Sequence, residues 1–277
     1  MKPIYFALFL FLTSASWAQE GNLFDRSHTV RFADHLFKSG QYDFAAREYE
    51  RLLFLEPRND TFQLQVLRAY RLANQTDKGL QRFSQFFNPS AHLTYPFALE
   101  RTKLGMNARQ WETTLSFIQQ SSVFPEPDQK IIQSSIFLFT DRFKEAQTMV
   151  LAIRDTTHFL YPAYRNLTEK ATQGPYKKPW LAGSLSLILP GAGKAYAGQW
   201  KDGLVSLIFT AGMAFQSYRG FTQQGIRGSK GWIYGGLGLG FYLGNVYGSA
   251  KAAKQFNIRK HDAIKHETSA LFTTYYP

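Results

Sequence analysis

Apolar residues recur at three- and four-residue spacing through the first half of the chain, as they do on one face of an α-helix. In residues 25–57 the apolar positions are Val30, Phe32, Ala33, Leu36, Phe37, Phe44, Ala45, Tyr49, Leu52 and Leu53. Ser39 and Gly40 interrupt this run, and Pro57 ends it. We therefore predict two amphipathic helices joined by a short turn, because glycine and proline both interrupt helices.

The same pattern returns after 34 residues, where its small and apolar positions are filled by Tyr70, Gly79 and Phe83. Helical spacing continues in residues 107–120, 128–154 and 159–171, and residues 141–146 repeat the start of the second helix. Recurrence of one supersecondary unit predicts a stack of helix pairs. We expect a mainly α fold, with residues 19–174 forming one helical-repeat domain.

Several residues of the first unit resemble the tetratricopeptide-repeat family. They are Phe32, Ala33, Leu36, Gly40, Gln41, Tyr42, Ala45, Tyr49 and Pro57, which match that family's Leu-Gly, Tyr, Gly-x-Tyr, Ala, Tyr and Pro positions. The resemblance implies a tetratricopeptide-like α-solenoid that binds a peptide or protein on the concave face of its first helices. The polar residues on that face are Arg31, Asp34, Lys38, Gln65, Arg68 and Arg71. Val30 and Asp34 replace the Lys and Asn of members that hold a C-terminal carboxylate, so we do not expect that mode of binding.

Three apolar stretches, residues 180–199, 203–221 and 231–250, follow a Gly- and Pro-containing linker at residues 175–179. None contains an acidic residue, and each is close to the roughly 20 residues that a bilayer span needs. We predict a membrane-embedded helical domain at residues 180–250, either a transmembrane helical hairpin or a three-helix unit. The charge distribution of the loops leaves two and three crossings open, and with them the side of the C-terminus.

Glycine recurs every fourth residue in the third stretch, at Gly236, Gly240, Gly244 and Gly248. Such a glycine zipper gives a helix a flat face to which another helix can come close. We therefore predict that these glycines pack membrane helices together and that the same face can join chains into a homo-oligomer.

The first stretch ends in a Pro-Gly-x-Gly-x-x-Tyr-x-Gly motif that resembles small bacterial two-helix membrane domains. The matching residues are Pro190, Gly191, Gly193, Tyr196, Gly198 and Gly203. That family implies no settled activity. Pro190 and Gly191 predict a break in the first helix, because proline removes a backbone donor and clashes with the preceding turn.

Charge is divided unequally along the chain. Residues 19–176 carry 19 basic and 17 acidic residues, whereas residues 177–277 carry 12 and 3, so the second part has a net charge of +9. Basic and aromatic residues flank the apolar stretches, and residues 251–277 form a basic tail. In this apolar context we expect the partner of the positive charge to be anionic membrane lipid and not nucleic acid.

The N-terminus has the pattern of a secretory signal peptide, predicted at residues 1–18. Lys2 precedes an apolar segment at residues 4–12, and Ser16 and Ala18 provide a small-x-small cleavage site. We therefore expect an exported membrane protein of the bacterial cell envelope, with its repeats in the periplasm or otherwise outside the cytoplasm. We favour the inner membrane, and the sequence leaves inner and outer membrane open.

No catalytic or cofactor-binding constellation is recognisable in the sequence. The chain has no cysteine, and its six histidines show no metal-binding helical spacing. Neither a Gly-x-Ser-x-Gly nor a His-Glu-x-x-His motif is present. We therefore expect that the protein is not an enzyme and that it binds no cofactor or metal. An enzyme whose active site is hidden between the repeat helices is a third alternative for the function.

These features predict an exported, membrane-tethered helical-repeat adaptor that binds or scaffolds a protein partner in the envelope. The alternative gives the activity to the membrane domain, as a small channel, transporter or oligomeric pore, with the repeats as an assembly arm. Lys194, beside an apolar stretch, favours this alternative, because charge within a membrane is often functional. A soluble exported protein is a further alternative.

Overall fold

The computed structural model describes residues 25–87 and 93–276, and in these ranges the protein consists of α-helices and connecting turns without strands. The chain divides into two compact units, Met1–Pro125 and Glu126–Pro277. The predicted signal peptide at residues 1–18 lies outside the described residues. The mainly α fold class predicted from periodicity is confirmed.

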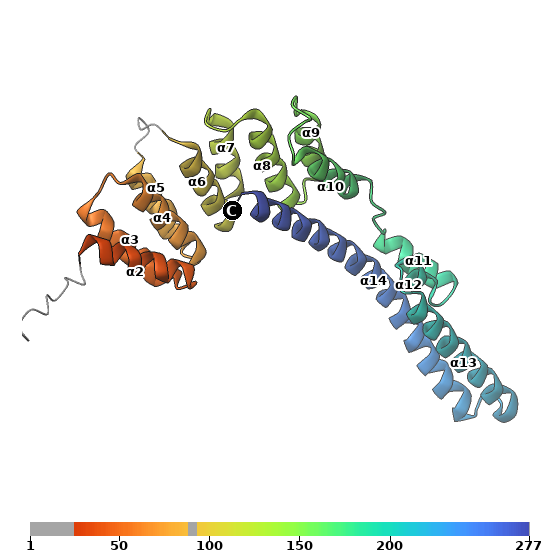
Figure 1. Cartoon of the computed structure of the whole chain (residues 1–277). Helices are drawn as coiled ribbons and strands as arrows, with labels where there is room; N and C mark the ends of the chain where they lie inside the picture. Colours follow the sequence, from red (N-terminus) through yellow and green to blue (C-terminus); the bar gives the residue numbers. More distant parts are fainter. Residues whose placement is uncertain (1–24, 88–92, 277) are drawn as a thin grey trace, which may run out of the picture. The chain divides into compact units, whose positions relative to one another are not determined.

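The first unit contains three successive helix pairs (Figure 1). The pairs are α2 (Arg26–Lys38) with α3 (Tyr42–Leu55), α4 (Asp60–Leu72) with α5 (Thr76–Phe86), and α6 (Tyr95–Asn107) with α7 (Trp111–Gln120). Each helix packs against the next, and α4 also packs against α6, the first helix of the following pair. This is the packing of a helical-repeat protein.

One turn geometry recurs inside every pair, including the fourth, α8 (Glu126–Phe139) with α9 (Phe143–Leu151). Gly40, Asn74, Arg109 and Asp141 each have positive φ, and the steps from 40 to 74, 74 to 109 and 109 to 141 are 34, 35 and 32 residues. The next residue donates its backbone N–H to a carbonyl five positions back, at 2.8–2.9 Å in all four turns. This is the Schellman ending of a helix. The helical repeat therefore extends beyond the first two helix pairs, which are the ones that the side-chain pattern shows clearly.

Small residues bring α2 and α3 together. Ala33, Ala45 and Ala46 have no exposed surface, and Tyr49 is 1% exposed in the same core. The Tyr49 hydroxyl donates to the Asp34 carboxylate at 2.6 Å, and burial of the ring raises the pKa of that hydroxyl. Close packing of alanines with a bonded tyrosine accounts for the spacing seen in the sequence.

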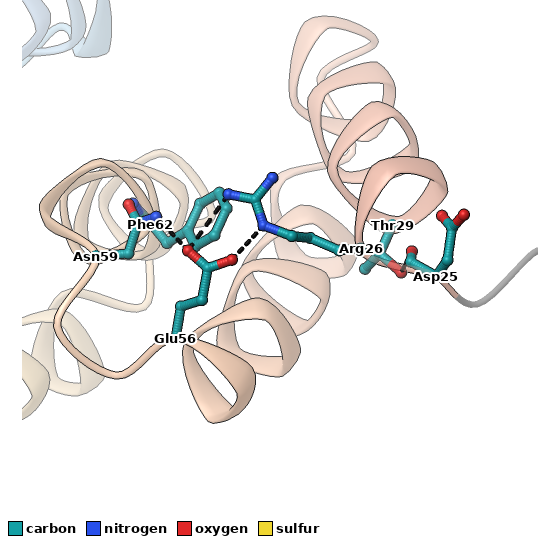
Figure 2. A network of polar contacts seen from close by, with 6 residues as sticks. All are labelled: Asp25, Arg26, Thr29, Glu56, Asn59 and Phe62. Carbon is teal, nitrogen blue, oxygen red and sulfur yellow. Dashed lines mark hydrogen bonds and ion pairs between the residues drawn. The ribbon is translucent and has the colours of Figure 1, made fainter.

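A polar network joins the first pair to the turn before the second, as Figure 2 shows. The Arg26 guanidinium forms an ion pair with Glu56, and it lies 5.6 Å from the centre of the Phe62 ring. The Asn59 amide donates to Glu56 at 2.7 Å, while its oxygen caps α4 by accepting from the Phe62 N–H. Glu56 thus fixes the turn that leads from α3 into α4.

The second unit continues after the fourth pair with five further helices. They are α10 (Tyr161–Gln173), α11 (Pro179–Ile188), α12 (Ala192–Tyr196), α13 (Trp200–Gln224) and α14 (Ser229–Tyr275). The linker predicted at residues 175–179 joins α10 to α11, so it lies inside this unit. The Asn257 side chain accepts from the Lys177 N–H and donates to the Lys177 carbonyl, both at 2.8 Å.

The helix α14 is 47 residues long and has two different environments. Its first part packs against α13 in an antiparallel hairpin, and its last part packs against α8 and α10 (Figure 1). In the last part, Lys265 pairs with Asp141 at 2.8 Å, and the Tyr276 hydroxyl that follows donates to Asp128 at 2.7 Å. The predicted basic tail at residues 251–277 is therefore the packed end of a helix, at least through Tyr276.

The predicted break at Pro190 is confirmed, since α11 ends at Ile188 and α12 begins at Ala192. Gly191 has φ of 88°, and a Cβ there would overlap the Gly203 carbonyl. A Cβ on Gly193 would likewise overlap the Ala182 carbonyl. The remaining motif residues also have structural roles: Gly198 has φ of 83°, and the Tyr196 hydroxyl accepts from the Lys178 N–H at 3.1 Å.

Transmembrane helices are not confirmed. Among the helices of residues 25–87 and 93–276, none combines the length and the apolar character that a bilayer crossing requires. The glycines, serines and threonines of α13 and α14 lower the hydropathy of the stretches that the sequence pattern marked as spans.

Candidate functional site

A cluster of charges lies between the first helices of the second and third pairs. Arg71 of α4 forms an ion pair with Glu100 of α6, in which the second guanidinium nitrogen lies 3.5 Å from the carboxylate. Lys103, one turn further along α6, has its ammonium 3.7 Å from the same carboxylate. The Glu100 and Lys103 side chains are 1% and 5% exposed, and that of Arg71 is 15% exposed. Three charged groups are thus held together almost out of water.

The electrostatics of this cluster are positive. Burial lowers the pKa of Lys103 to about 8, the Glu100 carboxylate opposes this shift, and Arg71 and Arg68 add to it. Lys103 is therefore influenced by two guanidinium groups as well as by one carboxylate. Such an arrangement can accept a further carboxylate or phosphate, since an added anion relieves the repulsion among the basic groups.

The structure brings together only some of the residues predicted for the concave face. Arg68 and Arg71 join the cluster, whereas Arg31, Asp34 and Lys38 lie on α2. Asp34 and Arg71 are engaged within the chain, by Tyr49 and Glu100 respectively.

The remaining predicted residues have fewer bonds. Arg31 donates to the Ser27 carbonyl at 3.3 Å, and Lys38 is exposed. The buried Gln65 oxygen accepts no hydrogen bond.

Glu100 and Lys103 were missed by the sequence analysis. The sequence feature that could have revealed them is the position of two charged residues in one helix beside apolar residues. Those apolar residues, Phe97, Ala98 and Leu104, are buried. A charge at a core position needs a partner, and this predicts an ion pair across the helix interface.

A second candidate site lies in the α13–α14 hairpin. The two helices contact each other through Gly231, Gly235 and Gly238, where an added Cβ would come within about 3 Å of Phe221, Ser217 and Met213 respectively. By contrast, the predicted zipper residues Gly236, Gly240 and Gly244 have nothing within 4 Å of a Cβ position, and Gly248 has only the Lys194 side chain. In residues 25–87 and 93–276, no other helix therefore packs closely on the zipper face.

The zipper face instead forms part of an open groove of about 450 Å³ between α13 and α14. The side chains that matter for its chemistry are Lys194, Ser206, Phe209, Leu237, Phe241 and Asn245. The walls are apolar and the polar groups are few, as in sites that bind small molecules.

Asn245 is the unusual group in this groove. It is 5% exposed, and neither its amide nitrogen nor its oxygen has a hydrogen-bond partner among the residues that the structure describes. A buried polar group without a partner costs about 1–3 kcal/mol. Its neighbour Ser249 is fully bonded, since its hydroxyl donates to the Asn245 carbonyl at 2.7 Å and bonds to Ser186 at 2.7 Å.

The hairpin also exposes large apolar side chains on both helices. They include Ile208, Phe215, Trp232, Ile233, Leu239 and Leu243, each at least 55% exposed. Of the residues in α13, only Gly203 and Gly220 are buried. A soluble surface rarely leaves so much apolar side chain uncovered without a lipid or protein partner.

No cluster of three or more metal-binding side chains occurs in the part of the chain that the structure describes. Histidines pair singly with carboxylates, for example His158 with Asp128 at 3.4 Å and His261 with Asp141 at 3.1 Å. These contacts are of the kind that stabilises helix packing.

Comparison with protein-family models, with curated proteins and with solved structures gives no match. The resemblance to tetratricopeptide repeats and to two-helix membrane domains therefore rests on the residues quoted above.

Proposed function

We propose that the protein is an exported, membrane-associated helical-repeat adaptor. Its tetratricopeptide-like helix pairs bind a protein partner in the cell envelope, and the α13–α14 hairpin attaches it to a lipid surface. The proposal requires attachment to a bilayer and leaves the number of crossings open.

The observation that carries the proposal is the uncovered apolar surface of the hairpin. Transfer of apolar side chains from water into lipid is favourable by roughly 25 cal/mol for each Å² buried. Arg219, Arg227 and Lys230 lie at the turn of the hairpin, where they can contact anionic headgroups. The repeats supply a second, polar surface, on which Arg31 and Lys38 of the first helix α2 are exposed.

Attachment is tested by flotation of the full chain with vesicles. We expect wild-type protein to float with vesicles, and the double variant Ile208→Asn/Leu239→Asn to float at least tenfold less. The matched control is Phe44→Asn/Phe54→Asn, which makes the same change at two exposed positions of α3. Equal flotation of the hairpin variant and the wild type would remove the hairpin from the proposal.

Partner binding is tested by crosslinking in cells that express the protein. The variant Lys38→Gln/Arg68→Gln removes two charges from the first helices. Neither of these two side chains forms an ion pair within the described residues. We expect this variant to lose the crosslinked envelope protein, because an acidic partner segment loses its counter-charges. Arg58→Gln/Arg109→Gln removes two exposed charges from turns and should retain the partner. Retention by both variants would show that the first helices do not form the binding face.

A further inference from the structure

The groove between α13 and α14 contains a cation without a counter-charge. The Lys194 ammonium is half-buried and donates to the Ser206 hydroxyl at 2.8 Å. It pairs with no carboxylate in the described part of the chain. Its side chain passes Gly248 of α14, where an added Cβ would lie 3.6 Å from the Lys194 Cε. The site therefore offers a positive charge beside a largely apolar surface.

The buried amide of Asn245 lines the same groove and adds an unused donor and an unused acceptor. A ligand that satisfies both must present an acceptor and a donor at neighbouring positions. An anionic oxygen can accept hydrogen bonds from the Lys194 ammonium and from the amide nitrogen. A hydroxyl can donate a hydrogen bond to the amide oxygen.

The rest of the groove suits a hydrocarbon chain. Phe209 and Phe241 form its walls and are about half exposed, so the groove opens onto the apolar surface of the hairpin. Gly236, Gly240 and Gly244 give it a floor without side chains. A chain lying there would cover backbone and aromatic surface that is otherwise in contact with water.

A second copy of the hairpin fits this groove less well. Between Asp202 and Asp262 the sequence has no acidic residue, so another α14 offers no carboxylate to Lys194. The strongly basic second part of the chain also repels a second copy of itself. Charge complementarity therefore favours an anionic occupant that also carries a hydrocarbon chain.

We propose that this groove binds one molecule of an anionic phospholipid with a hydroxyl-bearing headgroup, of the phosphatidylglycerol type. Lys194 and the Asn245 amide nitrogen hold the phosphate, the Asn245 oxygen accepts from a headgroup hydroxyl, and one acyl chain lies along the glycine floor. This inference rests on the proposed attachment to a lipid surface, which brings the groove to its ligand.

The test is native mass spectrometry of the full chain released from detergent micelles that contain equal amounts of phosphatidylglycerol and phosphatidylcholine. We expect wild-type protein to retain one phosphatidylglycerol per chain. Asn245→Leu and Lys194→Gln should each lower the retained fraction at least tenfold. Asn245→Leu changes no charge, so its effect cannot come from general attraction between a basic protein and an anionic lipid.

The matched control is Lys201→Gln, which removes an exposed charge outside the groove and should retain the lipid even in 0.5 M salt. Thermal unfolding without lipid verifies the fold of each variant, and Asn245→Leu should be at least as stable as wild type, because it removes an unpaired polar group. Added phosphatidylglycerol should raise the unfolding temperature of wild type and leave that of Asn245→Leu unchanged.

Several outcomes would overturn the inference. They are equal retention of the two lipids, unchanged retention by Asn245→Leu, retention of a free fatty acid in place of phospholipid, and a dimer whose groove holds no lipid. Flotation with pure phosphatidylcholine vesicles separates this inference from the proposed function. Flotation without selective retention refutes the groove site alone, whereas selective retention without flotation on any vesicle refutes membrane attachment alone.

Discussion

At the scale of single residues, Glu100 of the first unit stands in an environment that is unfavourable for an unpaired charge. It is almost completely buried, and its carboxylate forms ion pairs with both Arg71 and Lys103. Removal of one charge from a buried ion pair is far more costly than the loss of a surface pair.

We predict that Glu100→Gln lowers the free energy of unfolding by about 3–5 kcal/mol, measured by urea denaturation. The control is Glu145→Gln, which breaks the exposed ion pair with Arg142 and should cost no more than about 1 kcal/mol. Losses of similar size in the two variants would contradict the assignment of Glu100 as a buried anchor.

The lowered pKa of Lys103 predicts a pH dependence of stability. The folded protein releases this proton near pH 8, whereas an unfolded lysine holds it until about pH 10.4. Between these values the unfolded chain binds more protons, so the free energy of unfolding should rise with pH through this window. Lys103→Met should flatten that rise in urea titrations at several pH values. An unchanged slope would place the titrating group elsewhere.

The sequence showed which residues carry charge in this region but not how they pair. Arg71 stood out as a polar residue on a first helix, and Glu100 did not, because the two are 29 residues apart and meet only when α4 packs against α6. Asn245 was missed for a related reason. Its burial depends on the angle at which α13 meets α14, and periodicity does not report that angle.

At the scale of secondary-structure elements, glycines of the second unit differ in role according to their surroundings. We predict that Gly193→Ala destabilises the protein by about 1–3 kcal/mol, because the new Cβ overlaps a backbone carbonyl of α11 and the two helices must separate. Gly240→Ala should instead stabilise α14 by up to about 1 kcal/mol. The added Cβ would have no atom within 4 Å, and alanine has a higher helix propensity than glycine. Chemical denaturation in detergent solution compares the two, and equal effects would refute the distinction.

Helix positions were predicted well where breakers are strong and poorly where they are absent. Gly40, Pro57 and Pro190 mark real boundaries, and the helices α2, α3 and α11 end close to them. No glycine or proline occurs between Ala250 and Tyr275, and α14 continues through this segment although its composition changes from apolar to basic. A change of composition alone does not end a helix.

At the scale of the whole chain, the second unit depends on the end of α14. Removal of residues 261–277 takes away the Tyr276 contact of Asp128 and the His261 and Lys265 contacts of Asp141, and it uncovers the packed faces of α8 and α10. We predict that this truncation speeds amide hydrogen exchange in α8, α9 and α10 by at least tenfold and leaves α2 to α7 unchanged. Uniform protection in the truncated protein would show that the fourth pair is stable without α14.

Domain organisation was only partly accessible from the sequence. The shift in glycine content and charge near residue 175 reflects a change in surface, from polar repeats to an apolar hairpin. The compact units follow packing instead, and the return of α14 to α8 and α10 places residue 175 inside the second unit. A contact between residues more than a hundred positions apart leaves no local signal.

The unbroken course of α14 limits which insertions and deletions the gene can accept. Each residue of an α-helix turns the following side chains by about 100°. Loss of one residue between Asn245 and His261 would therefore turn Lys265 away from Asp141 while the groove stayed intact. Changes of about seven residues restore the direction of the side chains within roughly 20°, but they move Lys265 by about 10 Å along the helix axis. The segment should therefore tolerate no change of length that keeps both the groove and the contact with Asp141.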